Sequence, residues 1–211
     1  MSASVPCKNR RLFDGTAVGV HVHVNANAGD GQMKSGMQRG IIGAAMMALA
    51  LLAAPAVFAQ ETADRVAANT DWSVFNPSAD PALCFMASAP KETVNTRDGK
   101  KVDAKRGSIV LYVTYRKGGD QGVVSFAGGY PFADKSTVKL TIDGKSFEMF
   151  TDDEHAWSNS PAEDAQIIGL MKAGKDAVAE GRSGRGTKTR DSFSLLGFSA
   201  SLSEAQKRCG N

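Results

Sequence analysis

The feature that most constrains the fold is a pair of alternating segments joined by a two-residue turn. In Thr137–Ile142 and in Lys145–Phe150, apolar residues alternate with polar ones, and Asp143-Gly144 lies between the two segments. Strict alternation places one face of a strand in a core and the other in water, and Asp-Gly favours a tight hairpin turn. The pattern therefore predicts an antiparallel hairpin with one buried face.

Further short apolar segments extend this pattern along the chain. Ser108–Tyr115 is rich in β-branched and aromatic residues, with apolar side chains at both alternations, which predicts a central strand. Weaker strand patterns occupy Asp71–Phe75, Leu83–Met86, Gly122–Phe126, Ala177–Ala179 and Ser192–Leu196. Seven or eight short strands of this kind predict a mainly β fold, an antiparallel β-sandwich.

Two helices are expected beside the strands. Ser160–Glu163 has the pattern of a capping box with proline at the first helical position, and Gly174 marks the end of this helix. Its apolar stripe comprises Ala165, Ile168 and Met171, widened by Ile167 and Leu170. A second, short helix is predicted from Ser201 to near Cys209. The amphipathic first helix is expected to lie on the sheet.

The first part of the chain has the pattern of a secretory leader. In residues 33–59, Lys34 and Arg39 precede an apolar run at Ile41–Ala54, and the segment ends on Val57-Phe58-Ala59. A basic start, a short apolar run and small residues at a cleavage site are typical of a signal peptide. The run of 14 residues is shorter than the roughly 20 needed to span a bilayer. We expect cleavage after Ala59 and no stable transmembrane span in the processed protein.

The residues before this leader are interpreted as an upstream extension. Residues 1–32 have no periodicity, and a signal peptide normally begins at the initiator, which favours Met33 over Met1 as the start. After cleavage, 60–70 is expected to be a flexible lead-in and 71–211 a single domain. These features predict a periplasmic, secreted or cell-surface location.

The charge of the processed chain excludes some partners. The chain of 211 residues has 25 basic and 22 acidic residues, and removal of five basic and two acidic residues with the leader leaves 20 of each. A net charge of zero gives no electrostatic reason to expect nucleic acid or an anionic membrane surface as a partner. The basic cluster at 182–190 is interpreted as a solvated face.

Two cysteines remain in the processed chain. Cys84 and Cys209 form an even pair in an exported protein, which favours a disulfide over the alternative of two buried free thiols. Such a bond ties the C-terminus to the beginning of the fold. By loop entropy it contributes about 4–5 kcal/mol.

The sequence offers little reactive chemistry. His155 is the one histidine after the leader, and no G-x-S-x-G motif occurs. Asp152, Asp153, Glu154 and His155 form an oxygen-rich run without the ligand spacing of a calcium loop. We therefore expect no metal, no cofactor and no enzymatic activity. A hydrolase with a site around His155 is the alternative.

A glycine-rich segment near the C-terminus approaches the spacing of a phosphate-binding loop. Gly181 and Gly186 have the required spacing, but Thr187 stands at the lysine position and the residues that follow alternate as a strand. The better interpretation is a glycine turn that enters a strand, with Gly181, Gly184 and Gly186 free to adopt positive φ. The hydroxyls of Thr187, Thr189 and Ser192 are then expected on the solvent side.

Several motifs together resemble a known family. The chain carries DWSVF, SAPKETVNTRDG, VSFAGGYPF and AWSNSPAEDAQIIGLMKAG, and then SGRGTKTRDSFSLLGFSASLSEAQKRC. This series is similar to the invasion-associated locus B family of exported alphaproteobacterial proteins, most specifically at Arg185–Phe198 and Gly128–Phe132. The resemblance implies a small periplasmic or surface β-sandwich without a cofactor, from a family named for host-cell invasion. The further cysteine that many members have after the first tryptophan is absent, which leaves Cys84 with Cys209.

These observations lead to a functional hypothesis. We expect a non-enzymatic binding or envelope module, whose partner is a protein or another envelope component. The candidate contact surface comprises Tyr130, Phe132, Arg185, Lys188 and Arg190, because aromatic and glycine-rich loops at the ends of sandwiches often bind partners. The alternative role of Tyr130 and Phe132 is to close the core.

Overall fold

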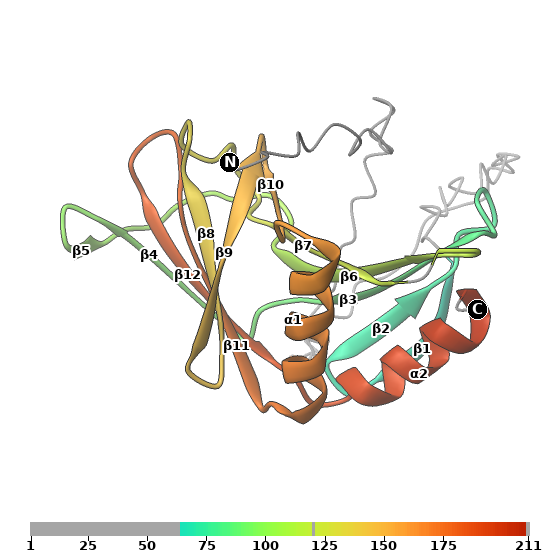
Figure 1. The fold of residues 1–211 in the computed structure, drawn as a ribbon. Coiled ribbons are helices and arrows are strands. Elements are labelled where there is room, and N and C mark those ends of the chain that lie inside the picture. The colour runs from blue at the N-terminus through green and yellow to red at the C-terminus, as the bar shows by residue number, and fades with distance from the viewer. Residues whose placement is uncertain (1–63, 120, 210–211) are drawn as a thin grey trace, which may run out of the picture.

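The computed structural model describes residues 64–119 and 121–209 (Figure 1). The predicted extension (1–32) and signal peptide (33–59), with its cleavage site, lie outside the described residues. Within them the chain forms antiparallel strands and two helices, which confirms the mainly β class.

The elements follow one another in a simple order. The strands are β1 (Arg65–Asn69), β2 (Trp72–Phe75), β3 (Leu83–Ser88), β4 (Glu92–Arg97), β5 (Lys100–Lys101), β6 (Val110–Arg116), β7 (Val123–Ala127), β8 (Thr137–Ile142), β9 (Lys145–Asp152), β10 (His155–Trp157), β11 (Asp176–Arg182) and β12 (Lys188–Ser194). The helices are α1 (Pro161–Ala173) and α2 (Phe198–Cys209).

All twelve described strands belong to one sheet, in the order β1-β2-β3-β6-β7-β10-β9-β8-β11-β12-β4-β5. The sheet bends into two parts, so the layers expected of a sandwich are joined by continuous hydrogen bonding (Figure 1). We call β1, β2, β3 and β6 with α2 the helix wing, because α2 packs against these strands. We call β8, β9, β11, β12, β4 and β5 the hairpin wing.

The strongest sequence patterns form the expected strands. The alternating pair becomes β8 and β9, and both residues of the turn between them have positive φ, 44° at Asp143 and 88° at Gly144. Two consecutive residues with positive φ match the twist of a two-residue hairpin. The most apolar segment forms β6, which lies between β3 and β7 as a central strand should.

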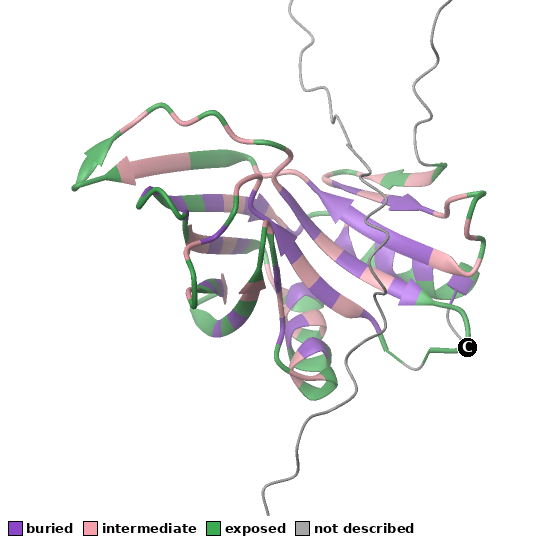
Figure 2. Cartoon of the chain, turned by 90° about the horizontal axis from the view of Figure 1, so that it is seen from above, coloured by how far each residue is buried: buried purple, intermediate pink, exposed green. Residues whose placement is uncertain are grey.

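The expected lead-in at 60–70 is corrected by the structure. It contains β1, which pairs with β2, so the sheet begins before residue 71. The charged segment that follows residue 90, which has no strand pattern in its sequence, also holds β4 and β5. All of these strands lie at or next to an edge, and none has a buried residue (Figure 2). Without a buried face they need no apolar alternation, which is why their sequences gave no signal.

The cap of α1 forms as expected, but its buried face is rotated. Ser160 Oγ accepts a hydrogen bond from the Glu163 N–H at 3.2 Å. The buried residues are Asp164, Ile167 and Met171, rather than a stripe that starts at Ala165. The carboxylate of Asp164 accepts the N–H of Val124 in β7 at 2.8 Å, and this bond turns the polar residue towards the sheet.

The second helix begins earlier than expected and closes the helix wing. It starts at Phe198, whose ring packs edge-on against Trp72 at a centroid distance of 4.9 Å. At its other end Cys209 forms a disulfide with Cys84 of β3, with the two Cα atoms 5.9 Å apart. The bond expected from the cysteine count is therefore present in the structure.

Candidate functional site

The two segments of the expected contact surface are neighbours at one end of the hairpin wing. Residues 128–132 follow β7, and residues 183–187 form the turn between β11 and β12. Phe132 forms a bridge with Ser183, and the N–H of Gly184 donates to the carbonyl of Pro131 at 3.0 Å. The N–H of Ala133 donates to the carbonyl of Arg182 at 2.9 Å. Sequence reasoning therefore chose two segments that the fold places side by side.

The aromatic residues of this surface point inwards. Phe132 is only 8% exposed and contacts Phe126 and Tyr130, with ring centroids 6.3 and 4.9 Å away. A Cβ atom at Gly181 would lie 2.9 Å from both the Phe132 ring and the Tyr130 hydroxyl. Gly181 thus gives these rings room within β11. In the glycine-rich segment only Gly186 has positive φ, 82°, which corrects the expectation for Gly181 and Gly184.

A buried ion pair lies directly beneath the rings. Arg106, in the loop between β5 and β6, donates two hydrogen bonds of 2.7 Å to the carboxylate of Asp191 in β12. The two side chains are 5% and 0% exposed. Paired, charge-assisted bonds of this geometry fix both groups in position. The pair therefore anchors the loop at 102–109 to the hairpin wing.

The remaining donors of Arg106 extend the network. Its Nε and one terminal nitrogen donate to the carbonyl of Gly128 at 3.0 and 2.8 Å, and its guanidinium lies 5.0 Å from the centre of the Tyr130 ring. The hydroxyls of Tyr130 and Thr189 are 2.6 Å apart. Burial raises the pKa of the Asp191 carboxyl, and the hydrogen bonds and charge of Arg106 oppose that shift. The network joins the loop, the 128–132 segment and β12 into one rigid base.

The structure corrects the face expected for two of the three hydroxyls of this segment, while Ser192 lies on the outer face as expected. Thr187 and Thr189 are buried, while Lys188 and Arg190 are exposed. The threonines share the inward face with Asp191, and each has a hydrogen-bond partner there, Arg97 for Thr187 and Tyr130 for Thr189. The signal for this register was Phe193, a buried residue two positions from Asp191. Arg106 itself lies in a charged loop without periodicity, so no local pattern indicates its role.

The outer face of the same hairpins carries a cleft. It has a volume of about 380 Å³ and is lined by Thr96, Asp98, Gly99, Arg182, Gly186 and Lys188. We call it the hairpin cleft. Arg185 is exposed in the turn beside it, whereas Arg190 lies one step further along the strand, 3.8 Å from Glu180. Of the five residues proposed from sequence, Lys188 lines the cleft and Arg185 borders it.

His155 does not gather the groups that a hydrolase needs. It is exposed in β10, and its ring stacks on Trp157, which in turn stacks on Phe150, with both centroid distances 5.6 Å. Among residues 64–119 and 121–209, neither a serine nor a carboxylate forms a hydrogen bond with the imidazole. The alternative of a triad at His155 therefore has no support in this geometry.

No group of three or more His, Cys, Asp or Glu side chains is placed to hold a metal ion within the described part of the chain. Neither α1 nor α2 has the length and apolar character that a membrane span requires.

Comparison with known proteins agrees with the resemblance seen in the sequence. Residues 73–206 match the model of a family described as Invasion associated locus B (IalB) protein. The chain belongs to the invasion associated locus B family. Among solved structures, it is similar to invasion associated protein B from Bartonella henselae, with 16% identity and a TM-score of 0.45 over 67% of this chain and 95% of that one. A search of curated proteins finds no significant match.

Proposed function

We propose that this invasion associated locus B protein is an exported, non-enzymatic binding module that contacts an envelope or host-cell component through the hairpin cleft and its rim. The observation that carries the proposal is the cleft itself. It lies where the β4–β5 and β11–β12 hairpins meet, and it is lined by polar and charged side chains. Ligands bind preferentially in concave sites, where polar groups fix their orientation.

The buried network supports a binding role because it fixes the rim of the cleft. Thr187, at the end of the β11–β12 turn, accepts a hydrogen bond of 2.7 Å from Arg97 of β4. The 128–132 segment behind the turn is fixed by Arg106. A rim that is already ordered loses little conformational entropy when a partner binds.

Export is the second part of the proposal. The signal-peptide pattern at 33–59 supports it, and so does the disulfide between Cys84 and Cys209, because disulfides form and persist in oxidising compartments. The expected location is the periplasm or the cell surface, after cleavage behind Ala59.

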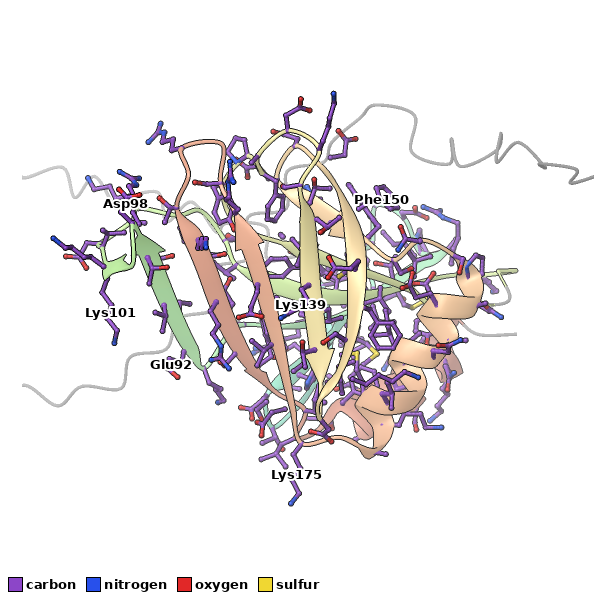
Figure 3. The ribbon with its side chains drawn as sticks, turned by 60° about the vertical axis from the view of Figure 1, so that its left-hand side comes forward. Glu92, Asp98, Lys101, Lys139, Phe150 and Lys175 are labelled. Atoms are coloured by element: carbon purple, nitrogen blue, oxygen red, sulfur yellow. A yellow bond between two sulfur atoms is a disulfide. The ribbon has the colours of Figure 1, made fainter. Side chains whose placement is uncertain are left out.

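Cross-linking in intact cells tests the proposal. A photoreactive amino acid replaces Arg185 at the rim, and in a matched protein it replaces Lys175, which is also exposed and lies at the opposite end of the sheet (Figure 3). We expect a discrete adduct from position 185 alone, in the periplasmic or surface fraction. Equal adducts from both positions, or an uncleaved protein in the cytoplasm, would contradict the proposal.

A further inference from the structure

A pair of like charges lies directly across two strands at the hairpin cleft. Arg182 of β11 and Lys188 of β12 are opposite each other in the register, and both are exposed. Like charges placed directly opposite each other destabilise a sheet. No carboxylate forms an ion pair with either side chain within the described part of the chain. The fold therefore provides no ion-pair partner for these two like charges.

The next pair on the same face has opposite charges. Glu180 of β11 is opposite Arg190 of β12, and its carboxylate lies 3.8 Å from Arg190 and 2.9 Å from Lys139 of β8. The same two strands thus balance charge at one position and leave it unbalanced two residues further on. The unbalanced pair is the one that lines the cleft.

The basic row continues onto the neighbouring hairpin. Lys188 is opposite Thr96 of β4, and Thr96 is opposite Lys101 of β5. Asp98 also lines the cleft and offsets part of the charge, without an ion pair to Arg182 or Lys188. In Figure 3, Asp98 and Lys101 lie together at the outer end of the β4–β5 hairpin.

We propose that the hairpin cleft binds a phosphoryl group, held between Arg182 and Lys188. This inference deepens the proposed function and rests on it for the identity of the binding surface. The guanidinium provides a planar pair of donors that matches phosphate oxygens, and the ammonium adds a point charge. A volume of about 380 Å³ accommodates a diphosphate or a phosphorylated sugar. A bound anion also removes the repulsion that the free protein retains.

Calorimetric titration with inorganic pyrophosphate tests the site in solution, and co-sedimentation with vesicles tests phosphoryl groups on lipids. The vesicles contain phosphatidylglycerol in phosphatidylcholine, with pure phosphatidylcholine as the blank.

The test variant is Arg182→Gln/Lys188→Gln. The control Lys117→Gln/Lys175→Gln removes the same charge from exposed lysines elsewhere. Loss of two charge-assisted contacts is expected to weaken binding at least about tenfold, and the control variant binds like the wild type.

The outcomes separate the source of the anion from the existence of the site. Binding of pyrophosphate alone supports a free phosphate compound, and binding of acidic vesicles alone supports a lipid or glycolipid headgroup. An equal loss in both variants shows a response to net charge and overturns the inference. Absence of binding to either probe overturns it too, while a cross-linked adduct at position 185 would still support the broader binding role.

Discussion

The two wings of the molecule are closed by different interactions. In the helix wing, α2 lays Phe198, Leu202 and Ala205 onto a buried apolar face, and a disulfide fixes its end. In the hairpin wing, the interior between β12 and the 102–109 loop contains a bidentate ion pair with hydroxyl and carbonyl partners. Apolar contacts tolerate small shifts, whereas the ion pair demands one geometry. The residues beneath the candidate binding surface are therefore held in the more strictly defined geometry.

The largest loss of stability is expected at a glycine of the helix wing that is packed closely against backbone. Gly197 precedes α2 with φ of 90°, and a Cβ atom there would lie 1.8 Å from the carbonyl oxygen of Asn69 in β1. Gly197→Ala therefore has to separate α2 from β1, because backbone lies on both sides of the contact. We expect a loss of at least about 4 kcal/mol in the free energy of unfolding, measured by urea denaturation.

Gly144→Ala is the matched control for this change. Gly144 has nearly the same φ, 88°, but nothing lies within 4 Å of its added Cβ atom. Only the conformational strain of the left-handed region remains, about 1–3 kcal/mol. If both variants lose the same stability, crowding against β1 is not what requires glycine at 197.

The next largest effect is expected from breaking the ion pair of the hairpin wing. Arg106→Met leaves the Asp191 carboxylate buried without its partner, which costs about 3–5 kcal/mol. The carboxyl pKa, already raised by burial, rises further once Arg106 no longer opposes it. The folded state then binds a proton more readily than the unfolded chain, so the variant should be more stable at pH 5 than at pH 8. Urea midpoints at the two pH values measure this.

A double variant sharpens the same prediction. Arg106→Met/Asp191→Leu removes both charges, and the loss should be smaller than for Arg106→Met alone because no isolated charge stays buried. A double variant as unstable as the single one would show that the bonds from Arg106 to the Gly128 carbonyl matter more than the charge of Asp191.

A smaller loss of stability is expected when the disulfide that closes the helix wing is removed. Cys84→Ala/Cys209→Ala opens a loop with a sequence separation of 125. Loop entropy alone gives about 4–5 kcal/mol, but disulfides typically contribute about 2–4 kcal/mol. We expect the smaller cost, measured as a shift in the denaturation midpoint. Amide exchange in β11 and β12 should keep its pattern, because β3 and α2, which carry the two cysteines, pack against strands of the helix wing. Equal loss of protection in both wings would show that the disulfide stabilises the whole sheet.

The sequence predicted the parts of the fold that follow from apolar periodicity. The β8–β9 hairpin, the central strand β6 and the cap of α1 each carry a local signal, and each is where the pattern indicates. The edge strands β1, β4 and β5 have no buried face and gave no such signal.

The candidate site was predicted only in part, for a related reason. Lys188 and Arg185 were chosen from a glycine-rich turn, which is a local feature. The buried Thr187 and Thr189 have hydrogen-bond partners from distant segments, Arg97 and Tyr130. Asp191 on the same face pairs with Arg106, at a separation of 85. A polar residue faces inwards only when its partner is present there, and no local pattern reports a distant partner.

The smallest change in stability is expected at alkaline pH. It is seen by comparing a tyrosine of the helix wing with one that packs against the hairpin wing. In the helix wing, burial and the nearby charge of Asp164 raise the pKa of Tyr115 to about 12. In the hairpin wing, burial raises the pKa of Tyr130, while the Thr189 hydroxyl and the Arg106 charge oppose the shift. The Tyr115 contribution is fully present below the unfolded pKa near 10 and is lost as the pH rises towards 12, because the unfolded chain releases its proton first. Tyr115→Phe should therefore remove more of the alkaline loss of stability than Tyr130→Phe, as measured by urea midpoints at pH 9 and 11. The opposite ranking would mean that the Thr189 hydroxyl and the Arg106 charge do not offset the burial of Tyr130.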